Sequence, residues 1–190
     1  MERKGGVEMT DELKNISLTG RLCYLFMCIE KYLFSCYPDR DWTPAAKKCW
    51  QWTNGFWDVG CDEYDKIVPA YLLEFDNYQE TNNREFDGML SKEDYDTLTE
   101  LYAGITNGRG EGDIDHILML PIEFSNVCEG TNFGYADKPT LAIIQEAQSI
   151  LEKYRIELPS IDKIKSLTVD QKNGWGEFME SEWLSEILTG

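Results

Sequence analysis

The chain has 190 residues and carries 35 acidic against 18 basic side chains, which gives a formal net charge of −17. Hydrophobic residues make up 42% of it and aromatic residues 13%, too many core-forming side chains for a disordered polypeptide. Its length suits one domain around one core, and its strong negative charge repels the phosphates of nucleic acids. We therefore expect a globular protein that does not bind nucleic acid.

The N-terminal sequence has no apolar stretch of the kind found in secretory signals, and charged residues interrupt the longest apolar run, Leu18 to Tyr37. This pattern favours a cytoplasmic protein with no membrane partner. We expect residues 1–15 to form a flexible segment and residues 16–190 to form one helical domain.

The six cysteines include no C-x-x-C pair, and His116 is the one histidine that could complete a zinc site. Disulfides are the other possibility, but a chain of this length with a large core seldom needs them. Because free cysteine is among the most frequently buried residue types, we expect buried, reduced thiols. We expect neither a metal nor another cofactor.

Apolar residues recur every three or four positions from Leu18 to Cys36, and their neighbours widen this face nearly all round, which predicts a central helix. A second helix is expected from Thr43 as N-cap, with Pro44 in its first position. Trp50 and Trp57 lie on a separate face of that segment. They are either buried by a neighbouring helix or exposed as a partner-binding strip.

Further along the chain, Pro69 breaks or restarts a short helix, and Ser91 caps another that ends near Asn107. A helix is expected from about Pro139 to Tyr154. Residues 113–128 fit either a helix or a strand, and we favour a helix. Since no alternation of period two persists, the sequence predicts an all-α fold, a single-domain irregular bundle of about six to eight helices.

The C-terminal sequence NGWGEFMESEWLSEILTG places Trp175 between Gly174 and Gly176. Two glycines give the backbone freedom to turn sharply around the indole. We expect this turn to be followed by a last helix that packs on the body through four apolar side chains, Trp183, Leu184, Ile187 and Leu188.

Catalytic and metal-binding patterns are weak. Asp113, Asp115 and His116 lie too close along a helix to point in one direction, and Asp113 suits an N-cap. The GRGEG stretch at 108–112 follows a helix rather than a strand and lacks the lysine of a phosphate-binding loop, so we interpret it as a connection. No G-x-S-x-G motif is present, and we expect no enzymatic activity.

The acidic residues are concentrated in one part of the chain. Residues 58–100 hold thirteen Asp or Glu against three basic residues, Lys66, Arg84 and Lys92. Such a stretch either keeps the protein soluble or forms an acidic face for a cationic partner. For the second case the candidate contacts are Trp57, Asp62, Glu63, Asp65, Glu74 and Asp76.

Four stretches, 18–33, 71–76, 133–144 and 173–176, resemble small all-helical immunity proteins of bacterial polymorphic-toxin systems; they read LTGRLCYLFMCIEKYL, YLLEFD, FGYADKPTLAII and NGWG. The resemblance spans most of the chain. It implies a cytoplasmic inhibitor that binds and blocks a partner toxin domain and has no catalysis of its own. Many such toxins are nucleases, which need positive charge to hold phosphates, so a cationic toxin would match the acidic stretch.

Two other classes stay open. A helical adaptor without a link to a toxin would need an exposed apolar patch, for which Trp50 and Trp57 are the candidates. A small hydrolytic enzyme would need a pocket where His116 and several acids converge.

Overall fold

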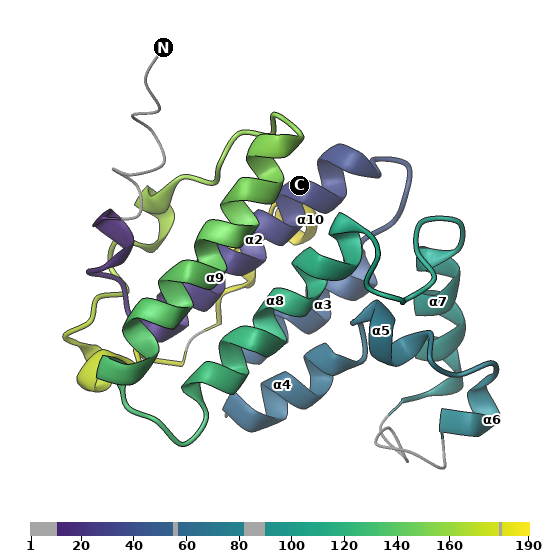
Figure 1. Ribbon diagram of the computed structural model, residues 1–190, viewed down its shortest axis with the longest axis horizontal. Helices are drawn as coiled ribbons and strands as arrows, with labels where there is room; N and C mark the ends of the chain where they lie inside the picture. The colour runs from purple at the N-terminus through teal and green to yellow at the C-terminus, as the bar shows by residue number, and fades with distance from the viewer. Residues whose placement is uncertain (1–10, 55–56, 82–89, 179) are drawn as a thin grey trace.

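The computed structural model describes residues 11–54, 57–81, 90–178 and 180–190. For residues 57–59 it describes the backbone but not the side chains. Within these ranges the chain is helical, without a strand, and the all-α prediction is confirmed (Figure 1). The α-helices and the short 3₁₀ turns (η) are α2 (Leu18–Cys36), α3 (Thr43–Gln51), η1 (Trp52–Asn54), α4 (Trp57–Asp65), α5 (Pro69–Leu72), α6 (Tyr78–Thr81), α7 (Lys92–Tyr102), α8 (Asp113–Cys128), α9 (Phe133–Lys153), η2 (Ile161–Ile164), η3 (Gln171–Gly174), η4 (Glu182–Leu184) and α10 (Glu186–Thr189).

Helix α2 is the centre of the bundle. Every residue from Leu18 to Glu30 is buried, as expected for a helix that is apolar nearly all round. Helix α9 packs on one side of α2 and α10 on the other, and α8 lies beside α9 (Figure 1). Helices α5, α6 and α7 form one end of the molecule. None of the helices in the described ranges is both long and apolar enough to span a membrane.

A buried arginine ties the first turns of α2 to distant segments. The Arg21 side chain is fully buried, and its guanidinium donates five hydrogen bonds of 2.7–3.2 Å. The acceptors are backbone carbonyls of Leu13 and Lys14 and three oxygens of Asp137 and Thr140 near the start of α9. Five donors match five acceptors, which offsets the cost of burying the charge. Leu13 lies in the segment expected to be flexible, yet it belongs to the core.

A buried carboxylate does the same near the other end of α2. Glu30 is 2% exposed, and its Oε1 accepts from Trp50 Nε1 at 2.7 Å and from the Ser185 hydroxyl. Its Oε2 accepts from the backbone N–H of Glu186 at 2.7 Å. Burial raises the pKa of the Glu30 carboxyl, and the hydrogen bonds from Ser185 and Trp50 lower it in part. One side chain thus joins α2, α3 and the start of α10.

The NGWG turn closes the C-terminal segment onto the start of α2. The carbonyl of Trp175 accepts from both the backbone N–H and the hydroxyl of Thr19, at 2.9 and 2.8 Å. One of the N–H groups that an α-helix leaves unsatisfied at its N-terminus is therefore satisfied by the turn. Gly176 has φ +87°, and a Cβ there would lie 2.5 Å from Ser17 Oγ. The turn needs glycine at this position for both conformation and space.

The start of α3 and the path of the tryptophans differ from the prediction. Trp42, not Thr43, is the N-cap of α3, because the Asp41 carboxylate accepts from the Thr43 N–H at 3.0 Å and begins the helix one residue early. Trp50 lies in α3 and Trp57 starts α4, so they do not share one helix. Trp50 is fully buried, which excludes it from an exposed strip.

Two later helices also have unexpected boundaries. Helix α9 begins at Phe133 rather than near Pro139, because the Asn132 side chain caps it by accepting from the Tyr135 N–H. Pro139 is exposed, so water can reach the carbonyl that loses its donor. Helix α7 ends at Tyr102 rather than near Asn107, because the chain reverses at Gly104, whose φ is +76°.

The last turns do not pack as expected. Leu184 is fully buried and Ile187 and Leu188 pack partly against the core, but Trp183 is 55% exposed. Residues three apart in a 3₁₀ turn lie on the same side, and Ser181 and Leu184 take the inward side. Trp183 therefore points outward, and the prediction that it packs on the body is wrong.

A first prediction concerns the close approach at the NGWG turn. Gly176→Ala should destabilise the protein by about 2 kcal/mol or more, because the new methyl group meets Ser17 in a conformation that already disfavours alanine. Gly104→Ala is the matched control, since Gly104 also has a positive φ but has nothing within 4 Å of an added Cβ. Chemical denaturation measures both variants. Equal losses would show that only the backbone conformation matters at Gly176.

A second prediction concerns Glu30. In Glu30→Gln the amide NH₂ must replace one oxygen, and each oxygen accepts from an N–H group that can only donate, of Trp50 or of Glu186. One donor is left facing another, and we expect a loss of about 1–3 kcal/mol in the free energy of unfolding. Glu123→Gln, on the exposed face of α8, should change it by less than about 0.5 kcal/mol. A loss of the same size in both variants would contradict the proposed role of Glu30.

A third prediction concerns the thiols. All six cysteines lie within the described ranges and none forms a disulfide; Cys36 and Cys61 are half-buried and the other four are buried. Burial raises the pKa of Cys23 and of Cys128 to about 12. A thiol reagent should therefore modify Cys36 and Cys61 of the native protein, faster as the pH rises, and the buried four only after denaturation. Rapid reaction of more than two thiols would contradict this burial pattern.

Candidate functional site

The predicted contact residues lie on α4 and just after α5. Asp62, Glu74 and Asp76 are exposed, while Glu63 and Asp65 are half-buried. Trp57 is the first residue of α4, and its side chain is outside the described part of the structure. The predicted set therefore divides into acids that face solvent and acids that face the protein.

Glu63 is part of an internal ion-pair network. Its carboxylate lies 2.6 Å from Lys66 Nζ and 3.3 Å from Lys48 Nζ, and Lys48 also lies 3.8 Å from Asp94 of α7. Burial alone would raise the pKa of Glu63, but the hydrogen bonds and charges of Lys66 and Lys48 outweigh it and hold that pKa below its ordinary value. Glu63 thus joins α4 to α3, and Lys48 extends the network to α7.

Two lysines of this region face inward and most of its carboxylates face outward, although Lys47 of α3 is exposed. Lys66 is 4% exposed, and only 12% of the Lys48 side chain is exposed. Lys92 is exposed, but it forms an ion pair with Asp96 one turn along α7. We call the exposed acids of this region the acidic surface: Asp62, Glu74, Asp76, Glu80, Glu93, Asp96 and Glu100.

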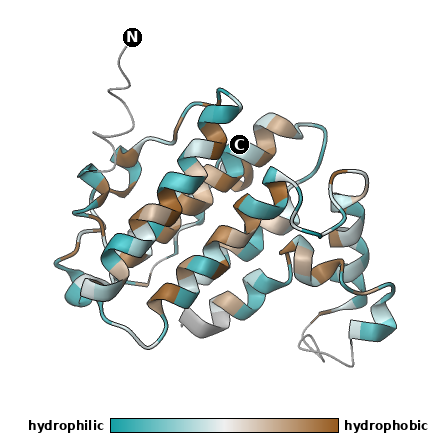
Figure 2. Cartoon of the chain, viewed as in Figure 1, coloured by the Kyte–Doolittle hydropathy of each residue, from teal (hydrophilic) through white to brown (hydrophobic). Residues whose placement is uncertain are grey.

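Helix α7 supplies three members of the acidic surface, and its other side anchors it. The hydroxyl of Tyr102 donates to the carbonyl of Ile67 at 2.6 Å, and that of Tyr95 to the carbonyl of Phe75 at 3.0 Å. Arg40 donates to the carbonyls at 100 and 103, at 3.1 and 2.8 Å, and so satisfies the C-terminal end of the helix. Hydrophilic residues cover much of α6 and α7 (Figure 2).

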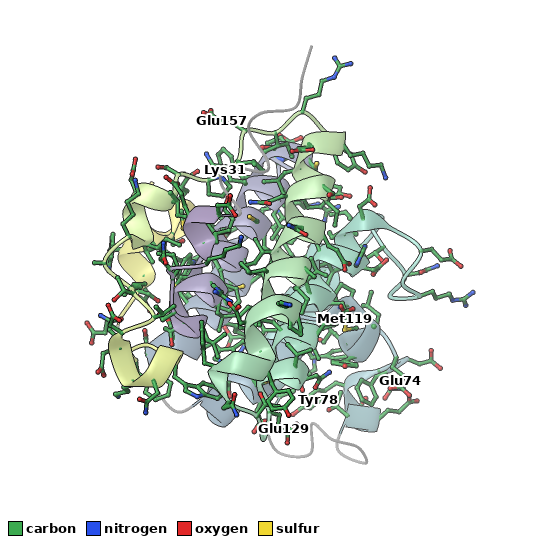
Figure 3. The ribbon with its side chains drawn as sticks, turned by 60° about the vertical axis from the view of Figure 1, so that its left-hand side comes forward. Lys31, Glu74, Tyr78, Met119, Glu129 and Glu157 are labelled. Carbon is green, nitrogen blue, oxygen red and sulfur yellow. The ribbon has the colours of Figure 1, made fainter. Side chains whose placement is uncertain are left out.

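The spacing of these three acids in the sequence is a signal for one exposed helical face, but the predicted contact set does not include them. Glu93, Asp96 and Glu100 are spaced by three and four, the period of one helical face, opposite the apolar stripe of the same helix. Glu80 lies on α6, and Glu74 and Tyr78 lie in the same corner of the bundle (Figure 3). Glu74 belongs to the predicted contact set, whereas Glu80 and the three acids of α7 do not.

The aspartates near His116 have separate partners. Asp113 forms an ion pair with Lys153, and Asp115 accepts from Thr106 on another loop. His116 is exposed, with its Nε2 3.2 Å from Glu146 of α9. The N-cap of α8 is Gly112 rather than Asp113, because the Asp115 carboxylate reaches back to the Gly112 N–H at 3.3 Å.

Nothing in the described ranges groups three His, Cys, Asp or Glu side chains closely enough to hold a metal ion. The GRGEG loop packs against α5, since a Cβ at Gly108 would lie 2.5 Å from the carbonyl of Pro69. The backbone conformations of its three glycines thus allow a tight connection between α7 and α8. Comparison with family models, with curated proteins and with solved structures finds no match to this chain.

Proposed function

We propose that this protein is a cytoplasmic inhibitor that binds and neutralises a cationic protein toxin domain, as the immunity proteins of polymorphic-toxin systems do. The separation of charge around α3 carries the proposal. Lys48 and Lys66 are turned inward to the network of Glu63, while the acidic surface faces solvent. A surface of one sign attracts a partner of the other sign and repels competitors of its own.

The inhibition that we propose is steric and electrostatic. A toxin that acts on nucleic acid must present Lys or Arg to phosphates, and a protein that covers those side chains with carboxylates excludes the substrate. The exposed acids need not move far to do this, because the helix that carries three of them is fixed by Tyr95, Tyr102 and Arg40. Preorganised contacts lose less entropy on binding.

The adaptor alternative depended on an apolar patch formed by Trp50 and Trp57. Trp50 is fully buried and hydrogen-bonded to Glu30, so it cannot contribute to an exposed apolar patch with Trp57. We therefore keep toxin neutralisation as the function that the geometry supports best.

The test is a charge reversal at the acidic surface with a matched control. The triple variant Asp62→Lys, Asp76→Lys, Glu100→Lys should weaken binding of the toxin domain encoded beside the gene by about tenfold or more, mainly by slowing association. The control reverses three exposed acids, Glu123 of α8, Glu129 directly after α8 and Glu152 of α9, and so changes the net charge equally. Binding kinetics at low and high salt measure both.

We expect the control to retain its affinity within about threefold and to keep the salt dependence of the wild type. Unaltered melting curves should accompany both variants, because exposed charges contribute little to stability. Equal binding by the two variants would remove the acidic surface from the mechanism. Failure of the wild type to bind any neighbour-encoded toxin domain would contradict the proposed function itself.

A further inference from the structure

One large aromatic side chain is held outward by a rigid turn. Trp183 is 55% exposed, although Ser181, Leu184 and Ser185 around it are at most 1% exposed. A tryptophan left in solvent between buried neighbours forgoes a few kcal/mol of apolar burial. Such a residue is typical of a binding surface, where tryptophan is the most enriched anchor.

The backbone on both sides of Trp183 is fixed. The Ser181 and Thr53 hydroxyls form a hydrogen bond, which attaches the turn to η1, directly after α3. After Trp183, the hydroxyl of Ser185 donates to Glu30 and caps α10 by accepting from the Leu188 N–H at 2.9 Å. The indole is therefore presented in a preset position, and a partner that binds it need not order this part of the chain.

Of the other exposed aromatic side chains, Phe34 and Tyr135 are 64% and 75% exposed, whereas Tyr154 and Phe178 have an internal role that Trp183 lacks. Tyr154 donates its hydroxyl to Asp113 at 2.8 Å, and the Phe178 ring lies 5.5 Å from Lys172 Nζ. Within the described ranges, Trp183 has neither a ring contact nor a hydrogen bond of its side chain. Internal packing does not explain its outward position.

The charge around Trp183 indicates the chemistry of the partner. Residues 177–190 contain four glutamates and no lysine or arginine. Glu177 pairs with Lys172 and Glu186 with Lys31, at 2.7 and 3.0 Å, whereas Glu180 and Glu182, which precede Trp183 in sequence, are both exposed. An apolar anchor among carboxylates complements an apolar slot bordered by lysine or arginine, which can also stack on the indole.

Helix α3 borders both this region and the acidic surface. It contacts α4 and α7, and it also contacts η4 and α10. In Figure 3 the C-terminal segment, in yellow, lies along α2, in purple. The two regions therefore share α3 as a neighbour.

We propose that Trp183, preceded by the exposed Glu180 and Glu182, is the anchor of the interface with the cationic toxin domain. This inference rests on the proposed function for the identity of the partner. The acidic surface guides the encounter and sets the association rate. The indole, which the partner buries in the complex, sets how long the complex lasts. Charge at an interface acts mainly on association, and a desolvated aromatic anchor acts mainly on dissociation.

The experiment compares Trp183→Ala with Tyr135→Ala, because Tyr135 is 75% exposed at the start of α9, away from α3. The probe is the toxin domain that the wild type binds. Trp183→Ala should lower the affinity by about 30-fold or more through faster dissociation, with an unchanged association rate and melting curve. Trp183→Phe should recover part of the loss, and Tyr135→Ala should bind as the wild type does.

A second measurement follows the indole directly. Acrylamide should quench the emission of the free wild-type protein more than that of Trp183→Phe, and this difference should disappear in the complex. Binding by Trp183→Ala at wild-type strength, or an equal loss in Tyr135→Ala, overturns the anchor and leaves the proposed function standing. Absence of binding by the wild type overturns both.

Discussion

The burial of α2 on all sides from Leu18 to Glu30 is the constraint on which the other elements depend. A helix in this position can carry a charge only where another part of the chain supplies hydrogen bonds, and α2 carries two such charges, Arg21 and Glu30. The first draws in the segment before α2 and the start of α9; the second draws in Trp50 and the start of α10. Polar requirements therefore determine where the ends of the chain pack, and apolar contacts fill the space between them.

The pairing of buried charges also determines which charges remain on the surface. Three helices meet at Lys48 and Lys66. The ion pairs with Glu63 and, at longer distance, Asp94 offset the free-energy cost of burying these lysines. With Lys48 and Lys66 occupied, exposed carboxylates outnumber the exposed lysines, Lys47 and Lys92, on the outer side of this region. A surface of this kind repels itself as well as nucleic acid, so its persistence in a compact fold depends on the rigid packing of α7 beneath it.

Patterns within one helix were predictable from the sequence, and relations between helices were not. The periodicity of α2 and the Ser91 cap of α7 follow from local chemistry, and both are found. The pairing of Glu63 with Lys66 follows from their spacing of three residues at the end of α4, but the approach of Lys48 requires knowledge of how α3 and α4 pack. The direction of Trp183 depends on whether its turn is 3₁₀ or α, which four residues of sequence do not decide.

The hydrogen bond from Thr19 to the Trp175 carbonyl joins residues 156 positions apart in the chain, and the hydrogen bond from Glu186 to Glu30 spans the same separation. A chain growing from the ribosome therefore completes its central helix long before the groups that satisfy that helix have been synthesised. Until then the nascent protein holds an exposed apolar helix with an incompletely bonded carboxylate. Contacts of such long range slow folding, and the central helix becomes protected from aggregation and proteolysis only after the segment that contains Trp175 and Glu186 has been synthesised and has packed.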